Sequence, residues 1–182
     1  MNAQTVKVWD PFIRIFHWSL VFGLLLNGLI LDDDGKLHNQ VGYVVTTLVL
    51  LRLIWGLIGT RHARFSDFPP SLTDAMEQAQ DISVGRRRLH LGHSPLGALM
   101  IYNLLAAIVL LGVTGYMMGT NAFFGIEWVE EVHEFLAAWM GVSVTLHVCA
   151  VLYESLRTGV NLPRAMVTGR KTIPNWSAAD RD

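Results

Sequence analysis

The chain contains little charge and a single cysteine. Of its 182 residues only 16% are charged, against about 25% in an ordinary soluble domain. Such a low content of charged residues argues against a disordered chain, a nucleic-acid-binding protein and a disulfide-stapled secreted fold. Cys149 cannot form an internal disulfide on its own, so cysteine usage does not indicate a redox compartment. The length suits one domain, and we expect residues 1–182 to form a single one.

The chain contains four long apolar stretches with few charged residues. A helix that crosses a bilayer needs about 20 apolar residues, and four such stretches run over residues 12–31, 38–59, 96–119 and 129–153. Short connections follow the first and third stretches, and a long loop of residues 60–95 follows the second. Because helices leave no backbone group unpaired in hydrocarbon, the pattern predicts an all-α fold, a transmembrane four-helix up-down bundle.

Two segments need a closer look. The first apolar stretch is too long for a signal peptide and no small-residue cleavage site follows it, so we interpret it as a retained membrane helix. Within the long loop, the run SLTDAMEQAQDI predicts a helix that begins at a cap formed by Ser71 or Asp74.

The net charge of −1 hides a strong sorting of basic residues along the chain. One side of the predicted bundle, which holds the termini and the long loop, carries Lys7, Arg14, Arg61, Arg64, Arg86, Arg87, Arg88, Arg157, Arg164, Arg170, Lys171 and Arg181, whereas the other side carries Lys36 alone. The positive-inside rule therefore predicts that both termini and the loop are cytoplasmic. The opposite side is acidic, with Asp32, Asp33, Asp34, Glu127, Glu130, Glu131 and Glu134.

Four of the seven histidines lie in or at the ends of the apolar stretches, namely His17, His38, His133 and His147. Ionisable residues inside a membrane are costly, and each is a functional-site hypothesis by default. His133 and His147 are 14 residues apart, which places them about 40° apart around a helix and about 21 Å apart along it. They therefore share a helix face but belong to two separate centres.

Each of these two histidines needs a partner at its own depth. By position in the apolar stretches, His38 matches His133 near the outer surface, and His17 matches His147 in the inner half. A zinc site would need three or four clustered ligands, whereas two bis-histidine pairs across a helical bundle are what two b-type haems require. Arg52 lies on the same helix face as His38 at the inner level, where it is placed to pair with a haem propionate.

The same residues carry a family resemblance. The matching segments cover nearly the whole chain in order and read VWDPFIRIFHWSL, LHNQVGYVVTTLVLLRLIWGLIGTRHARFSDF, LGHSPLGALM, VEEVHEFLAAWM, LHVCAVLYESL and NLPRAMVTGRK. They resemble the bacterial di-haem cytochrome b561 family, which is related to the cytochrome b subunits of nickel–iron hydrogenases. The resemblance implies a multi-pass protein of the bacterial inner membrane with two b haems held by His17, His38, His133 and His147. It also implies that Arg61, His62, Arg64 and His93 lie near the inner haem's propionates or a quinone site.

Our leading interpretation is a transmembrane electron conduit. Quinol is oxidised at one membrane face, and electrons pass between the haems to a periplasmic redox protein such as a basic c-type cytochrome. The acidic outer side favours such a partner by complementary charge. Three alternatives stay open: a superoxide-oxidising quinone reductase of the same fold, a haem-bearing membrane anchor subunit for a soluble oxidoreductase, and a metal-ion transporter that uses the histidines as binding sites.

Overall fold

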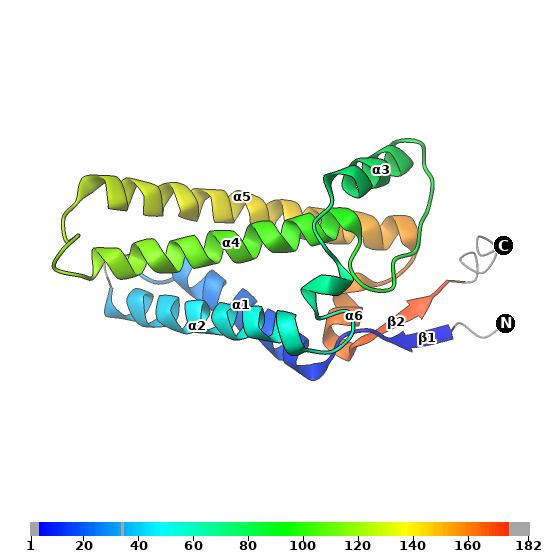
Figure 1. The fold of residues 1–182 in the computed structure, drawn as a ribbon, viewed down its shortest axis with the longest axis horizontal. Coiled ribbons are helices and arrows are strands. Elements are labelled where there is room, and N and C mark those ends of the chain that lie inside the picture. Colours follow the sequence, from blue (N-terminus) through cyan, green and yellow to red (C-terminus); the bar gives the residue numbers. More distant parts are fainter. Residues whose placement is uncertain (1–3, 34, 175–182) are drawn as a thin grey trace.

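Four long helices form two layers in the structure, a computed structural model that describes residues 4–33 and 35–174. They are α1 (Pro11–Leu29), α2 (Lys36–Ile58), α4 (Pro95–Met118) and α5 (Glu127–Thr158), and all four are long and apolar enough to cross a membrane. Figure 1 shows α1 and α2 as one layer and α4 and α5 as the other. The prediction of four apolar helices is confirmed, although α5 continues to Thr158 rather than ending at residue 153.

Shorter elements gather at one end of the bundle. They are β1 (Gln4–Lys7), the 3-10 turn η1 (Phe65–Asp67), α3 (Leu72–Ser83), α6 (Leu162–Thr168) and β2 (Arg170–Ile173). The fold is mostly helical, as predicted, but not entirely so, because β1 and β2 form an antiparallel ribbon in which Val6 faces Lys171. Four-residue strands so far apart in the chain leave no hydrophobic period to detect. The described part of the chain is mostly helical, with six α-helices.

Polar side chains fix where the helices begin. Asp10 caps α1 by accepting a 2.9 Å hydrogen bond from the backbone N–H of Ile13, and Pro11 supplies the first helical residue. Ser71 caps α3, which settles the choice between the two predicted capping residues. The first turn of α4 is capped by Ser94, and Gln78 of α3 accepts a further 2.9 Å bond there from the N–H of Leu96. The loop helix α3 is thus tied to the start of α4.

The four long helices do not all touch one another. Helix α4 packs against both α5 and α2, and α1 packs against α2, whereas α1 and α5 make almost no direct contact. Val49, Ile108 and Met140 are buried where α2, α4 and α5 meet. The outward surfaces are apolar and exposed, as a lipid environment requires, and include Ile15, Phe22, Leu57 and Leu146.

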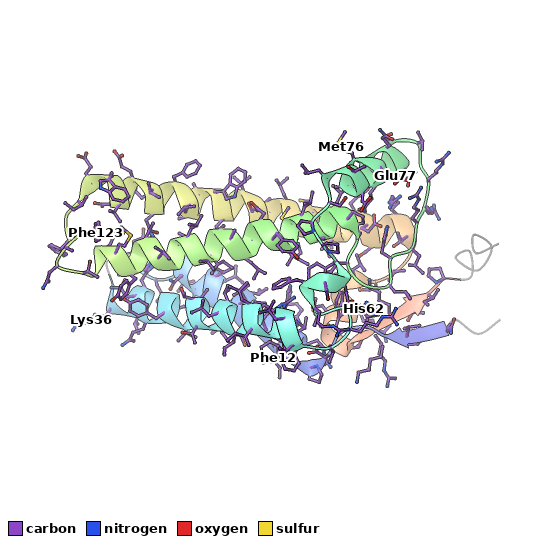
Figure 2. All side chains as sticks on the ribbon, in the orientation of Figure 1. Phe12, Lys36, His62, Met76, Glu77 and Phe123 are labelled. Atoms are coloured by element: carbon purple, nitrogen blue, oxygen red, sulfur yellow. The ribbon has the colours of Figure 1, made fainter. Side chains whose placement is uncertain are left out.

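The two ends of the bundle differ. In Figure 2, Lys36 and Phe123 lie at one end, and His62, Met76 and Glu77 lie at the other. We call the first the hairpin end, formed by residues 30–33, 35 and 119–126 with the adjoining turns of the helices, and the second the ribbon end, formed by β1, β2, α6 and residues 60–94. Because β1 precedes α1 and β2 follows α6, both ends of the described chain lie at the ribbon end (Figure 1).

Asp10 joins three segments at the ribbon end, and replacing it tests this junction. Besides capping α1, its carboxylate accepts hydrogen bonds from the Trp55 indole and the Thr60 hydroxyl. We expect Asp10→Ala to lower the free energy of unfolding by about 1–2 kcal/mol through the lost cap alone. Thermal unfolding in detergent measures this loss, and Asp32→Ala at the exposed hairpin end is the control. An Asp10→Ala protein as stable as the control would contradict the assignment.

The stability that Asp10 contributes at this junction should depend on pH. Burial alone raises the pKa of Asp10, but hydrogen bonds from Thr60, the Ile13 backbone and Trp55 outweigh it and lower the pKa below the ordinary value. A lowered carboxyl pKa stabilises the folded state above the ordinary pKa, and this stabilisation is lost as the pH falls through the folded value. The stability difference between wild type and Asp10→Ala should therefore shrink in acid.

Candidate functional site

Two pairs of imidazole rings face each other across the bundle. His17 of α1 and His147 of α5 have ring centroids 6.5 Å apart. His38 of α2 and His133 of α5 also have ring centroids 6.5 Å apart. The first pair lies in the half of the bundle nearer the ribbon end, and the second lies at the hairpin end, one turn into α2 and two turns into α5.

The spacing within each pair suits one metal ion between two imidazoles. Two metal–nitrogen bonds of about 2 Å, each extended to a ring centre about 1.2 Å further on, place the centroids about 6.4 Å apart. Within residues 4–33 and 35–174, no group of three or more His, Cys, Asp or Glu side chains is placed to hold a metal ion. Any metal between these rings would therefore take its remaining ligands from a cofactor, as the iron of haem does.

The surroundings of the pairs leave room for a large group. The helices that carry His17 and His147 barely touch, so the two rings project from separated backbones. Gly28 of α1 has no atom within 4 Å of the place where a side chain would begin. Buried Nδ1 atoms of His17 and His38 find no hydrogen-bond partner among the described residues. No hydrogen bond from the described residues engages Nδ1 of either ring, so each imidazole is free to bind a metal ion through its other nitrogen.

Two polar side chains at the hairpin end were missed by the sequence reasoning. Thr114 of α4 places its hydroxyl 2.8 Å from Nδ1 of His133. Asn27 of α1 donates a 3.1 Å hydrogen bond to the backbone carbonyl of His38. Both residues are polar and lie inside apolar stretches, so the sequence alone marked them as candidate functional residues. The sequence did not show that each of them hydrogen-bonds a histidine.

Arg52 is the one charged residue in the interior of α2, and only 4% of its surface is exposed. Its Nη2 donates a 2.9 Å hydrogen bond to the carbonyl of Ala63, and its guanidinium lies 4.9 Å from the centre of the Phe65 ring. The other terminal nitrogen, Nη1, is buried and meets no acceptor in the described part of the chain. A buried guanidinium with a free N–H donor is suited to bind an anionic group.

His93 is enclosed at the ribbon end between two aromatic rings. Its ring centre lies 4.6 Å from that of Trp9 and 4.2 Å from that of Phe68. Burial, together with the nearby charges of Lys171 and Arg52, lowers the pKa of His93 to about 3. The imidazole is therefore neutral at physiological pH, and its Nδ1 has no partner in the regions described.

Lys171 of β2 is the second buried cation of this end. Its ammonium donates 3.0 Å hydrogen bonds to the carbonyls of His90 and Gly92 and lies 5.4 Å from the centre of the Trp9 ring. Burial lowers the pKa of Lys171 to about 8. The ribbon thus anchors the segment that holds His93. Sequence reasoning missed this role because it depends on pairing between distant strands.

The remaining loop candidates are more peripheral. Arg61 and Arg64 are exposed, and Arg64 pairs with Asp67 at 3.5 Å. His62 adopts a positive φ of 70°, and its backbone N–H donates to the Asp67 carboxylate. Burial lowers the pKa of His62, and the charge of Arg61 adds to the effect. The structure therefore brings Arg52 and His93 into the interior and leaves Arg61 and Arg64 at the surface.

The position of Arg52 depends on close packing between Gly56 and Phe65, which gives a stability test. A Cβ on Gly56 would overlap the Phe65 ring, so Gly56→Ala must push away the ring beside Arg52. We expect a loss of about 1–3 kcal/mol in the free energy of unfolding. In a Phe65→Leu background the same alanine should cost less, because the smaller side chain leaves room. Equal costs in both backgrounds, measured by thermal or denaturant unfolding, would refute the contact.

Comparison with known proteins agrees with this architecture. A sequence model of the prokaryotic cytochrome b561 family matches residues 8–169. A probable Ni/Fe-hydrogenase B-type cytochrome subunit of Rhizobium leguminosarum bv. viciae is 20% identical, with 94% of this chain and 90% of the relative covered. A protein of the same description from Bradyrhizobium diazoefficiens is 21% identical, covering 94% of this chain and 87% of the relative. No solved structure matches the chain.

The family match includes all four long helices, both histidine pairs and the ribbon-end residues Arg52 and His93. It agrees with a multi-pass membrane protein that uses b-type haem in electron transfer. The resemblance found in the sequence is confirmed, and the chain belongs to the prokaryotic cytochrome b561 family.

Proposed function

We propose that this chain is a di-haem b-type cytochrome of the bacterial inner membrane, formed by one domain over residues 1–182. It transfers electrons between membrane quinone or quinol and a periplasmic redox partner. His17 and His147 hold one haem, and His38 and His133 hold the other. The observation that carries the proposal is the pair of 6.5 Å centroid separations, one at each level of the bundle.

Helix α5 determines the spacing of the two centres. His133 and His147 are 14 residues apart on one continuous helix, which corresponds to about 21 Å. Each ring meets its partner from another helix, so the ligands are fixed by packed backbone rather than by a loop. Haem supplies reversible one-electron chemistry when bound, while the protein fixes its position and tunes its potential. Rigid ligation of this kind leaves little to rearrange when the charge of a site changes.

Arg52 and His93 give the inner site its polar contacts. A haem carries two propionates, and the buried nitrogens without a partner among the described residues include Nη1 of Arg52, Nδ1 of His93 and Nε of Arg14. The guanidinium neutralises and hydrogen-bonds a carboxylate, while the neutral imidazole supplies a further hydrogen bond. Arg61, His62 and Arg64 surround this region from the loop and are suited to the approach of an anionic or quinone headgroup.

The orientation in the membrane follows from the basic residues. The ribbon end carries Arg61, Arg64, the run Arg86–Arg88, Arg164 and Arg170, whereas Lys36 is the basic residue of the hairpin end. We therefore assign the ribbon end and both termini to the cytoplasm. The hairpin end then faces the periplasm with Asp33, Glu127, Glu130, Glu131 and Glu134, and this charge favours a basic partner.

A second candidate function comes from the relatives. Both are described as probable B-type cytochrome subunits of Ni/Fe-hydrogenases. By analogy, this chain would be the haem-bearing membrane subunit of a soluble oxidoreductase, a role that needs no quinone site in the chain itself. The conduit and the subunit differ in whether the isolated chain reacts with quinol.

Reduction by a quinol analogue tests the conduit directly. We expect the purified, haem-loaded chain to show the visible spectrum of low-spin bis-histidine haem and to be reduced when a short-chain quinol is added. Stopped-flow absorbance measures the reduction. Haem that stays oxidised with quinol but is reduced by dithionite would favour the subunit function instead. A colourless protein would support metal transport, and reduction by superoxide but not by quinol would support the superoxide-oxidising enzyme.

Histidine substitutions test the ligand pairing. We expect His17→Ala or His147→Ala to remove one haem, and His38→Ala or His133→Ala to remove the other, each leaving about one haem per chain. Pyridine haemochrome analysis with redox titration measures the haem content and identifies the surviving haem. His90→Ala, outside both pairs, is the control and should keep two haems. If His17→Ala and His38→Ala lost the same haem, the proposed pairing would fail.

A further inference from the structure

Only one of the four paired histidines has a hydrogen-bond partner for its ring among the described residues. Nδ1 of His133 lies 2.8 Å from the hydroxyl of Thr114. Nδ1 of His17 has no partner, and Nδ1 of His38 is 3.9 Å from the nearest carboxylate oxygen, of Asp33, which is beyond hydrogen-bond distance. The two proposed haem sites therefore differ in what supports their ligands.

The direction of the Thr114 bond follows from the hydroxyl's other contacts. Its oxygen lies 2.9 Å from the carbonyl of Leu110 and 3.2 Å from that of Leu111, both of which accept from it. A hydroxyl has one proton to donate, and these carbonyls take it. With that proton on a carbonyl, the Thr114 oxygen is left to accept from His133 in the tautomer whose proton is on Nδ1, and the backbone carbonyl of Leu111 is a second acceptor for this ring. Nε2 is then left unprotonated, as a metal ligand must be.

The close approach of α4 and α5 makes this bond possible. Gly115 follows Thr114, and a Cβ at this position would lie 3.3 Å from Cε1 of His133. Thr114 itself is only 7% exposed, so water does not compete for its hydroxyl. The arrangement is a buried bond between two packed helices.

We infer that Thr114 is a positioning residue that holds His133 in one tautomer and orientation and lowers the reduction potential of the outer haem. The inference rests on the proposed ligation by His133. A hydrogen bond accepted from Nδ1–H raises the basicity of the opposite ring nitrogen. A more basic ligand stabilises the oxidised iron, which carries the greater positive charge. The other three ligands have no such support from the described residues.

The test compares two substitutions at Thr114 in the haem-loaded full chain. Thr114→Val keeps the shape of the side chain but removes the acceptor, and Thr114→Ser keeps the hydroxyl. With valine we expect two haems per chain, a shift of the outer haem's midpoint to higher potential and an altered low-spin ferric EPR signal of that haem. The inner haem should stay unchanged, and serine should restore values close to wild type. Thr145→Val is the matched control, because the Thr145 hydroxyl bonds only the carbonyl of Gly141 on its own helix.

The outer haem is identified as the component that disappears in His133→Ala. An outer potential that is unchanged in Thr114→Val, or a serine variant that shifts as far as valine, overturns the role of Thr114 while leaving the ligation intact. If His133→Ala keeps both haems, the ligation itself fails and the inference fails with it. The two failures are thus distinguishable.

Discussion

Hydrocarbon offers no hydrogen-bond partners, so every polar side chain within the four long helices must be satisfied from inside the protein. Most of them are. The Asn103 amide donates to the Ser143 hydroxyl and accepts from the Trp139 indole, which ties α4 to α5 in mid-bundle. Arg52 uses the carbonyl of Ala63 for one of its nitrogens. The buried polar atoms left over among the described residues include Nδ1 of His17 and of His38 and the free nitrogens of Arg14, Arg52 and His93. An anionic group of a bound cofactor would satisfy the free nitrogens of the two arginines and His93.

Hydrogen bonds at the ribbon end fix the positions of the buried charged groups. Asp10 joins the start of α1 to Trp55 and Thr60 at the end of α2, while Lys171 connects the distant β2 strand to the segment before α4. Together they hold Arg52 and His93 near each other, although 41 residues separate them in the chain. Helix α3 adds a clamp through the bond from Leu96 to Gln78. The polar interactions outside the bundle therefore position the charged groups within it.

Local sequence patterns predicted the four helices and the histidine pairs. Features that depend on contacts between distant segments of the chain could not be predicted. Hydropathy alone located the four helices, since each needs a long apolar run. Angular spacing along α5 put His133 and His147 on one face, and the structure brings each ring to a partner at its own depth. The ribbon and the role of Lys171 were missed, because the four-residue strands that pair in it are separated by more than 160 residues. Thr114 was visible as a polar residue in an apolar run, but the rotation of α4 against α5 decides that it faces His133.

The unequal surroundings of the two pairs bear on the direction of electron flow. The His17–His147 pair lies toward the buried cations Arg52 and Lys171 of the ribbon end, whereas the His38–His133 pair lies near Asp33 and the acidic start of α5. Positive charge stabilises a site that gains an electron and negative charge destabilises it, most strongly where the dielectric is low. The hydrogen bond proposed from His133 to Thr114 would act in the same direction by favouring the oxidised state of a metal bound at His133. Each of these differences would make a redox centre at His17 and His147 the better electron acceptor of the two. Under the proposed ligation, electron transfer from the His38–His133 site to the His17–His147 site is therefore downhill on the protein's own electrostatics, and transfer in the reverse direction requires the electron donor to supply the difference.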